Sequence, residues 1–429
     1  MNKNLHVALE KFANLELADL HVHFGGIISP LTAWQLGIKN QLIRVAERGG
    51  VFQVDNCKLL PKGDPNKGYL SIFKKGFAIG EGKKPINLEY ACFRGNFHKF
   101  DQIMATIQGH RHGWGALQDE DDVRYVFARY LISVKKDNIS YSEMQINLRI
   151  SLLLYPVLSS AAALQKFALL LKEISIDFLK NGVSLRFIQC FNHSYSKGIE
   201  SRAEEALQNL IEARSFAPDI FVGLESAGKE ELCSTSYDTL FNIYRKAYKL
   251  GFGCEMHAGE QAGSGYMKRV MQMPLHRVAH GVQMIECNDL IKEVNSKDVS
   301  IVMMPHINVH LSLSISRNGE PTTVSSLERH PILKLFRENR VKICIASDNP
   351  ELGGLSVRRA FKDMIKMREG ISLEEVAILC LNSARSCFDK KWGQAYEQRI
   401  CKWISCCDLD QDYIFSFYSA EDMQMDQLL

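Results

Sequence analysis

The sequence predicts an α/β fold, a single (β/α)8 barrel of the TIM type with a helical insertion between strands 1 and 2. Short apolar runs alternate with longer helical patterns, which indicates parallel strands joined by crossover helices. The runs are apolar at nearly every position, as is typical of strands buried on both faces. Such a barrel needs eight strands, and eight runs are found, at residues 17–23, 139–146, 185–192, 220–226, 253–257, 277–281, 299–305 and 341–347.

The gap between the first two runs is far longer than one crossover connection needs. It covers residues 24–138. A stretch rich in Gly, Pro and Lys at residues 61–69 predicts a loop, and helical patterns resume near residues 88–109 and 119–135. We therefore expect a helical insertion over the barrel mouth, spanning about residues 37–118, rather than a separate domain.

The rest of the chain is expected to form one unit with this barrel. Helical patterns at residues 160–180 and 201–215 fit crossover helices after the second and third runs. Residues 1–390 are interpreted as a single metal-dependent barrel. Residues 391–429 are interpreted as a C-terminal extension, and about the last 30 residues, which end in YSAEDMQMDQLL, are expected to be a segment of low order.

The composition is typical of a globular protein in a reducing compartment. Hydrophobic residues make up 46% of the chain, and 52 basic against 49 acidic side chains give a net charge of +3. This balance favours no nucleic-acid partner. The 12 cysteines follow no disulfide-type spacing, and no apolar stretch has the length of a membrane span or the pattern of a signal peptide. We expect a cytoplasmic protein without membrane contact, and nothing in the sequence favours a particular oligomeric state.

Side chains that can bind a metal stand where several of the predicted strands end. His21 and His23 are two residues apart on the first strand, so both point to the same side. His257 ends the fifth run, and Asp348 follows the eighth. Active sites of such barrels lie at the carboxyl ends of the strands, and three imidazoles with one carboxylate suit zinc. Zinc bound there would lower the pKa of a bound water to about 7.

Two further polar residues beside these candidate ligands fit acid–base roles. Glu260 follows His257 by three residues, close to the expected metal without being one of its ligands. His280 lies at the end of the sixth run and precedes a glycine. It is suited to orienting a hydroxide and to stabilising developing charge.

The other histidines have less specific interpretations. A second pair spaced by two residues lies in a predicted helix or loop, and on a helix its members would face different ways. One histidine after the third run, and at least one of two after the seventh, either lines the pocket or packs in a loop. Another histidine flanks the sixth strand. The pair is His110 and His112, and the histidine after the third run is His193. The two after the seventh run are His306 and His310, and the one beside the sixth strand is His276.

The motifs at these strand ends resemble those of the adenosine deaminase family, which are metal-dependent purine deaminases of the amidohydrolase superfamily. HVH stands at residues 21–23, HAGE at 257–260, HG at 280–281 and SDNP at 347–350, in the same order as in that family. The resemblance runs from Leu17 to Phe388 and includes NSARSCF before its end, which is similar to the family's closing helix. The H-x-E and P-C-x-x-C motifs of cytidine-type deaminases are absent from the sequence.

The resemblance implies a role for each matching residue. Glu260 would protonate the ring nitrogen beside the attacked carbon of a purine, and His280 would position the hydroxide. Gly228, in the ESAG motif, matches a glycine whose backbone meets the purine ring. Only glycine has no Cβ to hold a flat ring away, although a plain turn glycine is the alternative. One zinc ion per chain would be bound by His21, His23, His257 and Asp348.

Three positions depart from the family's pattern, and all of them concern substrate recognition. Gly25 stands where the family usually has a side chain that meets the ribose. Asn349 stands where the family often has an aspartate that meets the imidazole nitrogen of the purine. The second run ends in QIN and lacks the arginine that is usual there. Gly25 and Asn349 are thus candidate substrate-binding positions, and the class of reaction is better defined than the substrate.

The expected function is zinc-dependent hydrolytic deamination of adenosine or a related 6-aminopurine nucleoside, with a small purine-like molecule as partner. One alternative is a deaminase of a different purine-like amine, such as a 5′-modified nucleoside, a nucleotide or a base. Another is a catalytically inactive binding protein of the same fold. A two-metal hydrolase is disfavoured because run four holds no lysine before Lys229. An enzyme is favoured because every residue with a chemical role is present.

Overall fold

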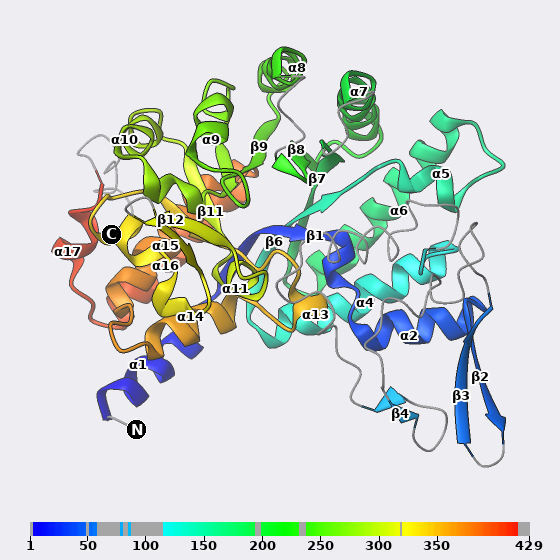
Figure 1. Cartoon of the computed structure of the whole chain (residues 1–429), viewed down its shortest axis with the longest axis horizontal. Coiled ribbons are helices and arrows are strands. Elements are labelled where there is room, and N and C mark those ends of the chain that lie inside the picture. The colour runs from blue at the N-terminus through cyan, green and yellow to red at the C-terminus, as the bar shows by residue number, and fades with distance from the viewer. Residues whose placement is uncertain are drawn as a thin grey trace.

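A parallel eight-stranded sheet, rolled into a barrel, forms the centre of the computed structural model (Figure 1). The strands follow one another around the barrel in chain order, β1-β6-β7-β8-β9-β10-β11-β14. A parallel bridge between Val22 and Asp348 joins the first strand to the end of the last, which closes the sheet. The structure describes residues 3–48, 51–57, 78–79, 85–86, 115–193, 199–230, 237–317 and 320–418.

The eight strands predicted from the apolar runs are all present, so the predicted barrel is confirmed. Most strand residues are buried, as expected for strands between a filled barrel interior and a layer of helices. The bounds of the strands are β1 (Leu17–His23), β6 (Ile139–Ile146), β7 (Ser184–Asn192), β8 (Phe221–Ala227), β9 (Gly253–Ala258), β10 (Arg277–His280), β11 (Ser300–Met303) and β14 (Ile343–Ile345).

Helices surround this barrel (Figure 1). In α6 the side chain of Ser159 caps the first turn by accepting from the N–H of Ala162. No described helix is long and apolar enough to cross a membrane. The helices that alternate with the strands are α2 (Pro30–Lys39), α4 (Glu120–Lys136), α5 (Ile150–Leu154), α6 (Ser160–Lys180), α7 (Ile199–Phe216), α8 (Tyr237–Lys249), α9 (Ser264–Val270), α10 (Asn288–Ser296), α11 (Pro305–His310), α12 (Ile332–Arg337), α13 (Pro350–Gly353) and α14 (Val357–Lys366), with the 3-10 turns η1 (Phe24–Ile27), η6 (Val282–Glu286) and η7 (Leu327–Arg329).

The long gap after β1 contains antiparallel strands in its described part, where a helical insertion was expected. β2 (Ile43–Arg48) pairs with β3 (Val51–Asn56), and β4 (Ala78–Ile79) pairs with β5 (Pro85–Ile86). Figure 1 shows the β2–β3 ladder reaching away from the barrel beyond α2. Both strands contain β-branched residues, Ile43 and Val45 in β2 and Val51 and Val54 in β3, and such residues favour strands. The helix expected over residues 88–109, the loop at residues 61–69 and the His110/His112 pair lie outside the described residues.

The C-terminal segment is ordered and packed as far as the structure describes it, so the expectation of low order is wrong up to Tyr418. The segment continues from α15 (Leu373–Ser386) into α16 (Lys390–Cys406) and α17 (Gln411–Phe415). An apolar stripe at helical spacing is buried on α16, through Tyr396, Ile400 and Ile404. The hydroxyl of Tyr418 donates to the carbonyl of Ile378 at 3.1 Å.

A further β-hairpin, β12 (Ser314–Arg317) with β13 (Glu320–Thr323), follows α11.

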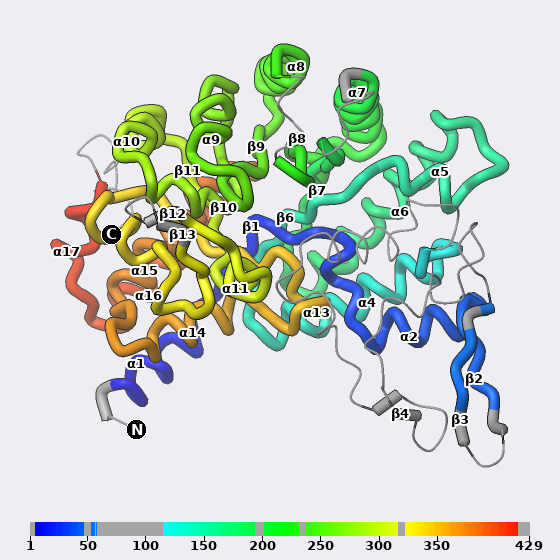
Figure 2. Tube along the Cα trace, viewed as in Figure 1, coloured from blue at the N-terminus to red at the C-terminus, as the bar shows by residue number. Residues whose placement is uncertain are grey.

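The N-terminal helix α1 (Lys3–Ala13) docks against α14, as Figure 2 also shows. Arg358 of α14 donates to the carbonyls of Phe12 and Ala13 at the C-terminal end of α1. The last carbonyl groups of a helix have no hydrogen-bond donor inside the helix. The guanidinium group of Arg358 donates the missing hydrogen bonds. This contact ties the start of the chain to a helix that follows β14.

Candidate active site

Six of the residues singled out in the sequence lie together at the carboxyl end of the barrel. Three of them form a cluster of imidazole rings. Nε2 of His23 lies 3.2 Å from Nε2 of His21 and 3.3 Å from Nε2 of His257. The ring of His280 is next to it, with its centroid 4.9 Å from that of His257. The convergence predicted from the strand ends is therefore present in the structure.

Carboxylates behind the imidazole rings decide which ring nitrogens face the centre. Oε1 of Glu255 lies 2.6 Å from Nδ1 of His21, and Oε1 of Glu225 lies 2.6 Å from Nδ1 of His257. The hydrogen bond between Nδ1 of His21 and Glu255 favours the tautomer of that ring with the proton on Nδ1 and a lone pair on Nε2. Burial lowers the pKa of His23 to about 3 and that of His257 to about 4, so the rings are neutral at pH 7.

This arrangement fits a metal ion. Lone pairs on three neighbouring Nε2 atoms repel one another unless a cation lies among them. The three atoms, from His21, His23 and His257, lie within 4.8 Å of one another. Asp348 adds a carboxylate, with Oδ1 3.5 Å from Nε2 of His23. The four side chains predicted as ligands therefore form one compact donor set.

Asp348 is held in place by its neighbours on both sides. The backbone of Asp348 has a positive φ of 67°, a conformation that is costly for residues other than glycine. Nδ2 of Asn349 donates to Oδ1 of Asp348 at 2.5 Å. Burial, together with the charges of Glu225 and Asp19, raises the pKa of Asp348 well above its usual range. A bound cation would oppose this effect and favour the ionised carboxylate.

Glu260 and His280 face each other beside the imidazole cluster. Oε1 of Glu260 lies 3.7 Å from Nε2 of His280, and both side chains are almost fully buried. Burial raises the pKa of Glu260 well above its usual value, and the charges of Asp348 and Glu230 raise it further. This raised pKa favours the protonated carboxyl group, which is the form that a general acid needs.

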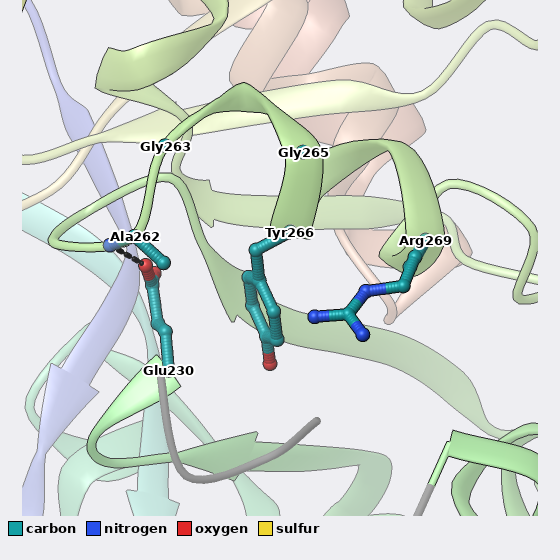
Figure 3. A pocket seen from close by; sticks show the side chains of 6 residues that line it. All are labelled: Glu230, Ala262, Gly263, Gly265, Tyr266 and Arg269. Carbon is teal, nitrogen blue, oxygen red and sulfur yellow. Dashed lines mark hydrogen bonds between the residues drawn. The ribbon is translucent and has the colours of Figure 1, made fainter. Parts of the chain in front are cut away.

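A buried carboxylate holds the loop that carries Glu260. Glu230, just after β8, accepts from the backbone N–H groups of Glu260 at 2.9 Å and of Ala262 at 2.6 Å. Figure 3 shows the side chain of Glu230 reaching up to the loop at Ala262. The side chains of Tyr266 and Arg269 extend from α9 beside it. These residues line a pocket of about 550 Å³.

The three residues predicted to read the substrate also lie near the strand ends. Gly228 follows β8 with a φ of 120°, which disfavours any side chain there. Gly25 is buried in η1, two residues after His23. Asn349 is packed so closely against Gly26 that a Cβ on Gly26 would overlap it. Since its amide nitrogen is bonded to Asp348, contact of Asn349 with a purine stays a prediction, as does contact with Gly25 or Gly228.

The other described histidines make local contacts. Nε2 of His193 donates to the carbonyl of Gly228 at 3.0 Å, which places this ring beside a predicted substrate-binding residue. Nε2 of His306 lies 3.1 Å from the carboxylate of Asp363, away from the cluster. Nδ1 of His276 accepts from the backbone N–H of Cys254. His276 therefore flanks its strand, as the sequence predicts.

A buried charge cluster below the imidazoles escaped the sequence analysis. Arg277 donates through Nε to Glu255 at 2.9 Å, and its NH1 lies 2.6 Å from Oε2 of Glu143. Because Glu255 also contacts His21, this cluster supports a predicted metal ligand. Charged residues inside otherwise apolar strands were the available signal, since such residues are buried only with partners. Asn308 and His330, which lie behind His280, were also missed.

Removal of Arg277 is expected to lower the free energy of unfolding by about 3–5 kcal/mol, because it leaves two buried carboxylates without their cation. Arg277→Met tests this in chemical denaturation, where stability is obtained from the unfolding midpoint and slope. Arg269→Met on the exposed side of α9 is the control and should change stability by no more than about 0.5 kcal/mol. Equal midpoints for both variants would show that the cluster contributes no net stability.

Comparison with known proteins places the chain in a family. The sequence pattern of the adenosine deaminase family matches residues 92–401. The chain belongs to the adenosine deaminase family. The matched region holds Glu260, His280, His257 and Asp348, whereas His21 and His23 precede it. As its motifs predict, this deaminase is a hydrolase that acts on a C–N bond of a cyclic amidine.

Several adenine and adenosine deaminases are similar to this chain. An adenine deaminase of Psychrobacter cryohalolentis is 24% identical over 313 residues, which cover 71% of this chain and 85% of that protein. An adenine deaminase of Wolinella succinogenes is 23% identical over 402 residues, or 92% of this chain and 97% of that protein. An adenosine deaminase of Clostridium botulinum is 23% identical over 248 residues, or 51% and 70% of the two chains.

Solved structures of other deaminases share the fold. The adenine deaminase of Arthrobacter aurescens has a TM-score of 0.65 at 20% identity, covering 91% of this chain and all of that one. A zinc-bound amidohydrolase of Burkholderia ambifaria has a TM-score of 0.65 at 16% identity, covering 96% of each chain. An N6-methyl-AMP deaminase of Arabidopsis thaliana has a TM-score of 0.59 at 14% identity, covering 92% and 98% of the two chains.

Proposed function

We propose that the chain catalyses the zinc-dependent hydrolytic deamination of adenosine or a closely related 6-aminopurine nucleoside, with release of ammonia. The observation that carries this proposal is the cluster of three converging Nε2 atoms beside Glu260, a buried carboxyl group whose pKa is raised. A metal-binding centre next to a general acid is what hydrolysis of a cyclic amidine requires. The adenine and adenosine deaminases among its relatives support the same substrate class.

One zinc ion per chain is the metal that best suits the donor set. Imidazole nitrogens and one carboxylate oxygen are common zinc ligands, and a structural neighbour holds zinc. When bound, zinc lowers the pKa of a coordinated water to about 7, which provides a nucleophile at neutral pH. The residues that would hold it are His21, His23, His257 and Asp348.

Glu260 would carry the proton transfers of the reaction. Addition of the oxygen of water to C6 of the purine places an electron pair on N1, and the carboxyl group of Glu260 donates a proton there. One proton of the water returns to Glu260, and the other goes to the amino group. The C6–N bond then breaks, ammonia leaves, and the ring keeps the oxygen at C6. The raised pKa of Glu260 suits it for the first of these transfers.

Purine binding would use the residues at the neighbouring strand ends. The positive φ and missing Cβ of Gly228 allow a flat ring to approach its backbone. The side chain of Asn349 would meet the imidazole part of the ring, where an amide donates a hydrogen bond at any pH. The pocket beside Glu230, Tyr266 and Arg269 would take the part of the substrate beyond the ring.

The function is tested with zinc-loaded protein and a panel of adenine, adenosine, AMP and N6-methyl-AMP. We expect release of ammonia, or of methylamine from the methylated compound, for at least one member, and the ranking of kcat/KM identifies the substrate. Zinc-depleted protein is the control and should be inactive until zinc is restored. Absence of amine release from every compound would contradict the proposed function.

Gly25 predicts tolerance at the 5′ end of the sugar. A site that pairs a hydroxyl group strongly rejects analogues that lack it, and Gly25 has no side chain to form such a pair. We expect 5′-deoxyadenosine and 5′-substituted adenosines to be turned over at least as well as adenosine. Gly25→Asp should shift the kcat/KM ratio towards adenosine, whereas Gly25→Ala, which adds bulk without a polar group, should not. A strong preference of the parent for adenosine would contradict this role.

A further inference from the structure

A chain of buried polar groups lies behind His280. Asn308, on α11, and His330, between η7 and α12, connect the ring of His280 to the backbone of α12. Asn308 has no exposed surface, and His330 is 4% exposed. Buried polar groups of this kind are costly unless each hydrogen bond has a donor and an acceptor, so the direction of every bond can be worked out.

The backbone of α12 fixes the first bond. The N–H of Ile332 lies 3.1 Å from Nδ1 of His330. A backbone N–H can only donate, so Nδ1 of His330 must accept. Burial lowers the pKa of His330 to about 3, so the ring is neutral at pH 7 and carries its single proton on Nε2.

The remaining bonds follow from this first one. Nε2 of His330, which carries the proton, donates to Oδ1 of Asn308 at 3.1 Å. The orientation of the Asn308 amide is thereby set, and its Nδ2 donates to Nδ1 of His280 at 3.0 Å. Because Nδ1 of neutral His280 accepts a bond, its proton lies on Nε2. That nitrogen faces Oε1 of Glu260 at 3.7 Å.

We propose that Asn308 and His330 are positioning residues that hold His280 in the tautomer with the proton on Nε2. In this tautomer His280 donates a hydrogen bond into the reaction centre and does not remove a proton from water. Proton transfer then falls to Glu260. This inference rests on the proposed function for its meaning in catalysis, although the tautomer itself can be measured without a substrate.

The tautomer is tested first, by nitrogen-15 NMR of zinc-loaded protein labelled at its 13 histidines. Neutral imidazole gives different shifts for a protonated and an unprotonated nitrogen, and the signals of His280 are those lost in His280→Gln. We expect Nε2 to be the protonated nitrogen of His280. A proton on Nδ1 in the parent protein would overturn the proposal. Because no substrate is needed, this outcome is distinct from failure of the deaminase assay.

Two variants then link the tautomer to turnover. Asn308→Asp replaces the donor to Nδ1 with an acceptor of the same size, and Asn308→Leu removes the donor. An imidazole held in the wrong tautomer lowers kcat by about 10⁴-fold in the serine protease triad. We expect a fall in kcat of about 10²- to 10⁴-fold, with KM within about threefold of the parent and unchanged zinc content. In the Asp variant the proton of His280 should move to Nδ1.

His306→Gln is the matched control, since it lies on α11 two residues before Asn308 and bonds to Asp363 instead. It should keep the kcat of the parent. A purely structural role would instead lower stability or zinc content without moving the tautomer. If both Asn308 variants retain kcat within about tenfold of the parent, the relay does not position His280 for catalysis.

Discussion

Replacement of Glu260 by glutamine should lower kcat by about 10²- to 10⁴-fold, the range that general acid–base catalysis usually contributes. Glutamine keeps the size of the side chain but has no acidic proton to donate to the purine nitrogen. The surroundings of Glu260 explain why the loss should be large. Burial and the charges of Asp348 and Glu230 raise its pKa well above the usual value, which favours the protonated form that makes this transfer.

The same variant should leave binding intact, which separates a catalytic role from a structural one. Zinc content and the affinity for a substrate analogue should match those of the parent, because Glu260 is not among the predicted ligands. Glu328→Gln makes the same chemical change on an exposed turn and should have no effect on kcat. A Glu260→Gln enzyme within about tenfold of the parent would refute the assigned role.

Loss of a predicted metal ligand should strongly lower the affinity for zinc. His257→Ala and Asp348→Ala each remove one donor from the compact set around Nε2 of His23. Loss of a residue that only orients a metal ligand lowers metal affinity by about 10- to 100-fold. The zinc affinity of these two variants should fall further, because each loses a ligand itself. Activity should fall with it, because zinc supplies the nucleophile.

Metal analysis of the purified variants checks this expectation. The parent should carry about one zinc ion per chain, and both variants should be strongly depleted after dialysis. His306→Ala, which removes an imidazole bonded to Asp363, should keep the metal. Full occupancy in both His257→Ala and Asp348→Ala would rule out the assigned ligands.

The parts of the molecule that were predictable from sequence are those with local signals. Continuous apolar runs located all eight strands, because parallel strands in a barrel are buried on both faces. The strand ends then located the cluster, since residues such as His21 and His257 sit where barrels bind ligands. The spacing of His21 and His23 showed that both face the same side. These inferences need no knowledge of distant contacts.

The parts that escaped prediction depend on partners far apart in the chain. Arg277 and Glu255 stabilise each other across neighbouring strands, and neither position alone reveals its partner. His330 reaches His280 only through Asn308, by bonds that exist only in the folded protein. The order of the last 30 or so residues was misjudged up to Tyr418 because charged residues obscured the buried stripe of α16.

The most direct test of the proposed chemistry is product analysis after reaction in water labelled with oxygen-18. We predict that the zinc-loaded enzyme converts a 6-aminopurine nucleoside into the 6-oxo product with one labelled oxygen and one ammonia for each molecule converted. Glu260→Gln should form this product at least about 100-fold more slowly. An unlabelled product, or the same rate with Glu260→Gln, would contradict hydrolysis by this site.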